Sequence, residues 1–177
     1  MNTALKWSTA LVLLGVISSG CRDGGANGPV EILPNVSPAR LGQMWPLGEN
    51  DPDPGSTERV PYELVILLTT ESGGLEIEEV CLEGSADALM QFALEGPVPE
   101  TPKRDEDAAL RITYERQAPG PEDNVAVVVQ SNAENFPTLV IPVCAQVVAE
   151  GQERVIFECS SPVTVAPGAR DDTLCAN

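Results

Sequence analysis

Residues 110–115 read LRITYE, with apolar side chains at the first, third and fifth positions and polar or charged side chains between them. Successive side chains of an extended strand point to opposite faces, so this alternation predicts a strand with one buried and one solvent-facing side. Further segments with alternating or continuous apolar character lie at residues 62–68, 75–77, 125–129, 139–148 and 155–157. The chain is therefore expected to be an all-β protein.

Turn-forming residues separate these segments. Proline and glycine gather at residues 51–55, 72–74, 96–102 and 118–121. Only residues 86–94 are compatible with a short helix, and a strand fits them as well. Several short strands divided by such turns favour a sandwich or a barrel.

In the expected strand at residues 75–82 the apolar side chains switch from odd to even positions. Ile77 and Val80 are both expected to face the core, although an uninterrupted strand would point them to opposite sides. A β-bulge at residues 78–79 resolves the conflict, because a bulge inserts one extra residue and resets the alternation. Cys81 is then expected to face away from Val80 and Leu82.

Six segments also follow one another in a familiar order. Residues 41–48 (LGQMWPLG) resemble an opening strand F-G-x-V-x-x-G, and residues 75–82 (LEIEEVCL) resemble P-L-x-I-x-x-V-x-L. Residues 92–96 resemble F-x-L-x-G, and residues 110–114 resemble V-x-V-x-F. Residues 125–132 resemble L-x-I-x-S-N, and residues 136–143 (FPTLVIPV) resemble a closing strand N-P-x-x-x-V-P-L. Over about residues 39–145 the chain thus resembles the ASH-type domain, an immunoglobulin-like module that also occurs in bacterial surface proteins with choice-of-anchor modules.

The resemblance implies an immunoglobulin-like antiparallel β-sandwich of about seven strands over residues 37–149, used as a spacer, scaffold or protein-binding module without catalytic residues. The chain departs from the family in two loops. Charged residues 103–107 replace the usual turn before residue 110, and the loop at 49–59 is longer and acidic. Residues 150–177 lie outside the pattern and are expected to form a C-terminal extension, in which Gly151–Gln152 would be the turn of a β-hairpin.

The N-terminus carries a targeting pattern. Lys6 precedes an apolar run at residues 7–17, shorter than the roughly 20 residues that a membrane-spanning helix needs. Small residues 18–20 then precede Cys21, which resembles the lipobox of bacterial lipoproteins. By this resemblance residues 1–20 are a signal peptide, Cys21 carries diacylglyceryl and an acyl chain such as palmitate, and residues 21–36 form a flexible tether. The alternatives are an ordinary secretory signal, with Cys21 in a disulfide, and an uncleaved anchor.

The cysteine count agrees with a lipid-modified Cys21. Removing it from the five cysteines leaves an even set, Cys81, Cys144, Cys159 and Cys175, suited to disulfides in an oxidising compartment. Four cysteines allow three connectivities, and the sequence does not choose among them. The preferred pairing is Cys159–Cys175 with Cys81–Cys144, because a hairpin turning at residues 151–152 would make Cys144 and Cys159 a hydrogen-bonded pair with widely spaced Cα atoms.

Charge and composition speak against several kinds of function. The chain holds 10 Lys and Arg against 27 Asp and Glu, for a net charge of −17, and it has no His. This acidity opposes binding to nucleic acid. Without His, and without a G-x-S-x-G motif, the sequence offers no familiar nucleophile and base. The carboxylates at residues 105–107, 122–123 and 171–172 fit solvated surface loops better than a catalytic cleft. The sequence has no C-x-x-C pair, which a zinc site would commonly use. The sequence predicts a protein that is not an enzyme and needs no cofactor or metal.

Two segments are candidates for binding. Trp45 is a candidate partner contact because tryptophan is enriched at interaction hot spots, although packing at the edge of the sandwich explains it as well. The acidic loop at 49–59 offers oxygen ligands for calcium but lacks the frame of an EF-hand.

These features together predict a protein held at the bacterial cell envelope by its lipid. Arg22, rather than Asp, follows the cysteine, which favours the outer membrane. The sandwich is expected to scaffold or bind another envelope protein and to take no small-molecule ligand. The alternative is a secreted, calcium-dependent module that binds a carbohydrate or matrix polymer.

Overall fold

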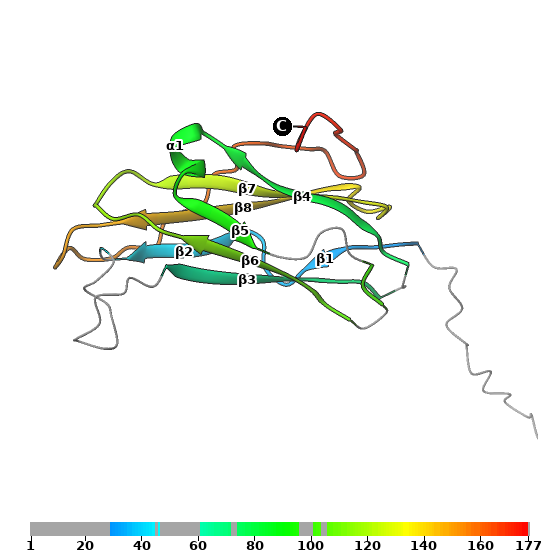
Figure 1. The fold of residues 1–177 in the computed structure, drawn as a ribbon, viewed down its shortest axis with the longest axis horizontal. Coiled ribbons are helices and arrows are strands. Elements are labelled where there is room, and N and C mark those ends of the chain that lie inside the picture. The colour runs from blue at the N-terminus through cyan, green and yellow to red at the C-terminus, as the bar shows by residue number, and fades with distance from the viewer. Residues whose placement is uncertain are drawn as a thin grey trace, which may run out of the picture.

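The fold was obtained as a computed structural model, which describes residues 29–44, 46, 61–71, 74–95, 101–103 and 106–176. The described residues form two four-stranded sheets packed as a sandwich (Figure 1), which confirms the predicted all-β fold. The first sheet has the order β1-β3-β6-β5, with β1 Leu33–Pro34, β3 Tyr62–Thr69, β6 Ala108–Tyr114 and β5 Phe92–Glu95. The second has the order β2-β8-β7-β4, with β2 Ala39–Met44, β8 Thr138–Val147, β7 Asp123–Ser131 and β4 Ile77–Gly84.

The strand order is that of an immunoglobulin-like sandwich. The β1-β3-β6-β5 sheet has the order of immunoglobulin strands A, B, E and D, and β4, β7 and β8 correspond to strands C, F and G. Among the described strands β2 runs parallel to β8, and the other neighbours are antiparallel. The chain crosses between the sheets at residues 35–38, so the first strand is divided into β1 and β2. This division accounts for eight strands where about seven were expected.

The alternation at residues 110–115 has the predicted consequence. Leu110, Ile112 and Tyr114 are at most 1% exposed and pack between the sheets. Opposite them β7 contributes Val125, Val127 and Val129, all fully buried in the same core. The core is thus built from every second residue of the facing strands, as the period of a strand requires.

The bulge in β4 is confirmed. Ile77 pairs with Ser131 and Glu79 pairs with Gln130, so the register shifts by one residue between Ile77 and Glu79. After the shift Val80 and Leu82 pack against the core. Cys81 therefore points to the outer face of the sheet, as the parity of the sequence predicted.

Residues 86–94, which fitted a helix or a strand, divide between the two. Ser85 begins the short helix α1 (Ala86–Leu89) by accepting a hydrogen bond from the backbone N–H of Ala88. The strand β5 follows from Phe92.

The predicted end of the tether at residue 36 is wrong. Ile32 is fully buried in the core, and Val30 and Val36 pack against it. The Oδ1 of Asn135 accepts from the Ile32 N–H at 3.0 Å, and its Nδ2 donates to the Ile32 carbonyl at 3.0 Å. The sandwich therefore begins near residue 30. In the sequence, Val30, Ile32 and Val36 stand among Pro and polar residues. For this reason their alternation was not recognised as that of a strand.

The predicted C-terminal hairpin is also wrong. The Gln152 N–H donates to the Ala149 carbonyl at 3.1 Å, so Gly151, with φ of +73°, is the second central residue of the turn rather than the first. Residues 148–176 contain no strand, including the expected one at 155–157. Instead of extending the sheet, this segment crosses over the β2-β8-β7-β4 sheet (Figure 1).

Candidate functional site

The C-terminal segment covers the outer face of the β2-β8-β7-β4 sheet. Ala126, Val128 and Cys144 are fully buried, yet they do not belong to the core between the sheets. Hydrogen bonds tie the segment to this face. The Ser160 N–H donates to the Asn124 Oδ1 at 3.1 Å, and the Gln130 Nε2 donates to the Asp171 carbonyl at 2.7 Å. Among the described residues, the sandwich consequently has one sheet whose outer face is covered. The other, on which Val65 is 38% exposed, is called the open sheet.

Two disulfides fasten this cover. Cys144 on β8 bonds to Cys159 with a Cα–Cα distance of 5.3 Å, and Cys81 on β4 bonds to Cys175 with 5.5 Å. Both distances lie in the ordinary range for disulfides. The four cysteines expected to form disulfides do form them. Each of the two disulfides joins a strand to the C-terminal segment.

The preferred pairing from the sequence is therefore wrong. Cys81 and Cys144 lie in one sheet with β7 between their strands, which are about 9.5 Å apart at two strand spacings. Cys81 is also opposite Val128 whereas Cys144 is opposite Asn124, four residues away along β7. The two cysteines are therefore well beyond the roughly 7 Å that a disulfide can bridge. Cys159 approaches Cys144 from above the sheet, because no hairpin forms. The wide Cα spacing of a hydrogen-bonded pair applies only to neighbouring strands, and Cys159 lies on no strand.

Several predicted residues lie outside the described part of the chain. Cys21, Trp45 and the whole acidic loop 49–59 belong to this group. Their roles stay predictions.

One of the carboxylates assigned to solvated loops is instead buried. Asp123 begins β7 and is 4% exposed. The Nη1 of Arg116 lies 2.7 Å and 2.6 Å from its two carboxylate oxygens, and the Tyr114 hydroxyl donates to its Oδ2 at 2.7 Å. A charge removed from water is tolerated when it is paired and hydrogen-bonded in this way. The Arg116–Asp123 pair ties the end of β6 to the start of β7.

The pKa values of this cluster follow its geometry. Burial raises the pKa of the Tyr114 hydroxyl well above its ordinary value, and the hydrogen bond to Asp123 raises it further. The hydrogen bond to Asp123 also raises the pKa of Arg116. Both residues stay protonated across the physiological range, so the cluster is fixed rather than poised for proton transfer.

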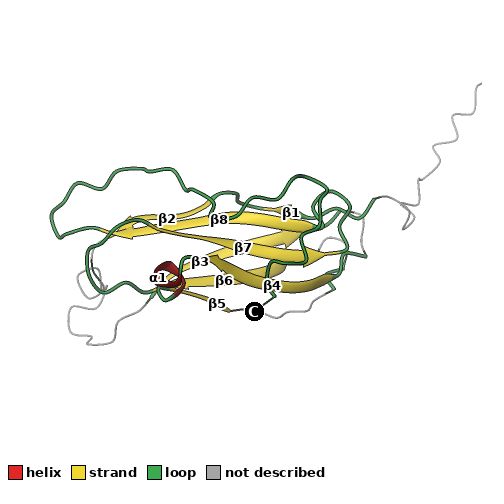
Figure 2. Cartoon of the chain, turned by 90° about the horizontal axis from the view of Figure 1, so that it is seen from above, coloured by secondary structure: helices red, strands yellow, loops and turns green. Residues whose placement is uncertain are grey.

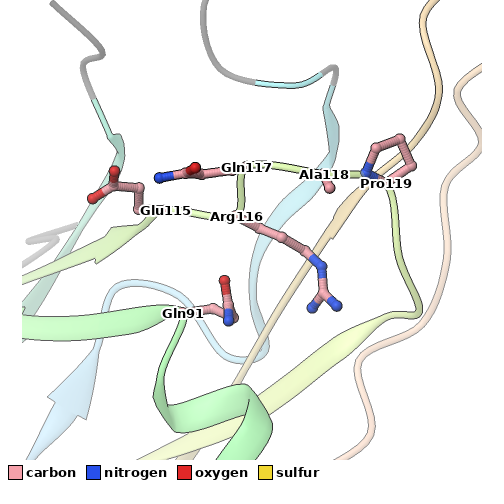
Figure 3. Close-up of a pocket in the computed structure, with 6 residues that line it drawn as sticks. All are labelled: Gln91, Glu115, Arg116, Gln117, Ala118 and Pro119. Carbon is pink, nitrogen blue, oxygen red and sulfur yellow. The ribbon is translucent and has the colours of Figure 1, made fainter.

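A shallow pocket of about 360 Å³ lies beside this cluster. Figure 3 shows the guanidinium of Arg116 and the amide of Gln91 on one side of the chain, with Glu115 and Gln117 extending away from the guanidinium. Six described residues line the pocket: Gln91, Glu115, Arg116, Gln117, Ala118 and Pro119. Their polar groups are the amides of Gln91 and Gln117, the Glu115 carboxylate and the Arg116 guanidinium, which can hydrogen-bond to a ligand.

Within the described ranges, no three His, Cys, Asp or Glu residues are close enough to hold a metal ion. Among the helices of those ranges, none is long and apolar enough to cross a membrane.

Comparison with known proteins gives no family. No protein-family model matches the chain, and no curated protein matches it.

Proposed function

We propose that this protein is a non-enzymatic lipoprotein of a bacterial cell envelope, anchored through Cys21, whose immunoglobulin-like sandwich scaffolds or binds another envelope protein. The observation that carries this proposal is the cysteine pairing. The two disulfides use Cys81, Cys144, Cys159 and Cys175. The one cysteine left is Cys21, which the lipobox-like sequence marks for lipid attachment. Disulfides also suit an oxidising compartment such as the periplasm.

The corrected start of the sandwich supports a specific arrangement at the membrane. With the core beginning near Val30, the tether is reduced to residues 22–29, which as a flexible coil would span about 16 Å. Two or three acyl chains on Cys21 would hold the protein stably, whereas a single chain binds a membrane only marginally. The end of the sandwich where the chain enters would then face the membrane.

The opposite end of the sandwich is thereby presented to partners. β2 and β8 both end there, far from the entry of the described chain (Figure 1). The resemblance to ASH-type domains supports a scaffolding or binding role, and the pocket chemistry beside Arg116 is compatible with it.

The test is the intact mass of the full chain, extracted from its own membranes with detergent and alkylated without reduction. We expect the mass of residues 21–177 plus two or three acyl chains, with no alkyl adduct. Cys21→Ser should abolish the lipid mass and release the protein from the membrane fraction. The matched control, Cys159→Ala, should keep the lipid and gain one alkyl adduct, at Cys144. A native mass without lipid would refute the anchor.

The binding role is tested by crosslinking in intact cells. A defined envelope protein should crosslink to the native chain and be lost with Cys21→Ser, which removes the protein from its site. Recovery of no specific partner from cells in which the native chain is lipidated would contradict the scaffold role.

A further inference from the structure

A second groove, of about 370 Å³, lies between β2 and the segment that returns over it. Figure 2 shows the loop after β8 extending beyond that strand and returning alongside β2 and β8. The groove is lined by Arg40, Gly42, Gln43, Arg154, Val155, Ile156 and Phe157. It lies on the covered sheet, it shares no lining residue with the pocket beside Arg116, and its lining residues are not part of the core.

A bulge in β2 builds the floor of this groove. Arg40 pairs with Cys144 and Gln43 pairs with Gln146, with a register shift between Arg40 and Gly42. Without the shift, Arg40 and Gln43 would point to opposite faces, because they are three residues apart. Gly42, with φ of +82°, adopts a backbone conformation that suits glycine. The bulge thus brings Arg40 and Gln43 to the same outer face.

The other wall of the groove is fixed before any ligand arrives. Gln43 accepts a hydrogen bond from the Val155 N–H at 2.6 Å and donates to the Gln146 Oε1 at 2.6 Å. The turn at residues 149–152 and the Cys144–Cys159 disulfide hold the two ends of the segment. A wall held at three points loses little conformational entropy on binding.

The wall of the groove exposes two apolar side chains. Ile156 is 91% exposed, the highest value among the large apolar residues described, and its neighbour Val155 is 57% exposed. Two adjacent exposed β-branched side chains beside a groove offer apolar surface that a partner could bury.

The charge of the groove is opposite to that of the protein. Arg40 and Arg154 both line it, on a chain whose net charge is −17. Arg111, Arg116 and Arg170 are each paired with a carboxylate, and Arg154 is not free of contacts either. None of the ion pairs between described residues involves Arg40, which is exposed.

We propose that this groove binds an extended peptide segment of a partner protein in which carboxylates alternate with apolar side chains. Guanidinium groups bind carboxylates in a bidentate geometry, and the exposed apolar wall would bury the apolar side chains of the peptide. An anionic bilayer fits less well, because the acidic surface as a whole repels it. The inference rests on the proposed function as a binding module, and it names the surface and the partner chemistry.

The test is selection from a library of random decapeptides displayed on phage, with the full chain in detergent as the target. Selected peptides should be enriched in Asp or Glu next to apolar residues. Their affinity, measured by fluorescence anisotropy, should fall about tenfold or more with Arg40→Gln or Arg154→Gln. It should fall again with Ile156→Ser. The matched controls are Arg111→Gln, which removes the same charge on the other sheet, and Met90→Ser, which removes an exposed apolar residue; both should bind as the native chain does.

The proposal is overturned if no peptide is selected, or if the selected peptides bind the Arg40 and Arg154 variants as tightly as the native chain. It is also overturned if vesicles of phosphatidylglycerol, compared with phosphatidylcholine, bind through these arginines while peptides do not. A chain that carries no lipid in the mass measurement would refute the anchor and leave the peptide result unaffected, so the two failures are distinguishable.

Discussion

Removal of the Cys81–Cys175 disulfide is expected to cost more stability than removal of Cys144–Cys159. A crosslink restricts the unfolded chain, and the restriction grows with the logarithm of the loop that it closes. The separations are 94 and 15 residues. At 25 °C the chain-entropy relation then gives about 4.7 kcal/mol for the longer loop and about 3.0 kcal/mol for the shorter. The expected difference in the free energy of unfolding is therefore about 1.7 kcal/mol.

The perturbation removes both partners of each bond, so that no new thiol is left to react. The two variants are Cys81→Ala with Cys175→Ala, and Cys144→Ala with Cys159→Ala. Equilibrium unfolding in urea without reductant gives the free energy of unfolding and the m-value of each variant. The m-value should rise more when the longer loop is opened, because the unfolded chain then exposes more surface.

The control is the native chain unfolded with excess reductant, which opens both disulfides and should therefore have a lower free energy of unfolding than either variant. A larger loss for the Cys144–Cys159 variant would refute the reasoning. That result would mean that the disulfides act by fastening the cover to the native sheet, because Cys144–Cys159 holds the nearer part of the cover and Cys81–Cys175 only its end.

Three other measurements address the cover, the start of the domain and the buried tyrosine. Val128→Ala should lower the free energy of unfolding by about 1.6 kcal/mol, at ~0.8 kcal/mol for each of two buried methyl groups. Val65→Ala, at a site already 38% exposed on the open sheet, should lower it clearly less. Equal losses in urea unfolding would argue against burial of Val128 by the C-terminal segment. Ile32→Ala should lower the free energy of unfolding by about 2–5 kcal/mol. A change near zero would mean that Ile32 belongs to the tether and not to the core. Because burial raises the pKa of Tyr114 in the native state, only the unfolded state loses this proton above pH ~10, so native stability should fall with rising pH there, by up to ~1.4 kcal/mol per pH unit. Tyr114→Phe should remove that part of the slope in urea titrations between pH 8 and 11, and unchanged slopes would contradict it.

The sandwich could be predicted because its signal is local. The alternation in β6 and the run of valines in β7 each specify which side chains face inward, without knowledge of the rest of the chain. The bulge before Cys81 was predictable for the same reason, since a change of parity is visible within eight residues of β4. The resemblance to an immunoglobulin-like module added the expected strand number.

The candidate site was less accessible to this reasoning, because it is made by segments that meet from distant parts of the chain. The paired Arg116 and Asp123 flank a loop, and only the closure of that loop buries the carboxylate. Phe157, Cys159, Ser161 and Val163 are half-buried at alternate positions, as in a strand. They form none, because the segment crosses the face of a sheet and its backbone finds no neighbouring strand to pair with.

The sequence by itself determined the all-β class, the positions of most strands, the acidity and the even set of cysteines that remains beside Cys21. The tertiary structure alone decided which cysteines pair, that Ile32 belongs to the core, and that the C-terminal residues cover one sheet and leave a basic groove beside β2. The physical reason is that side-chain periodicity is set by the geometry of one strand, whereas pairing and burial depend on which separate segments come within contact distance.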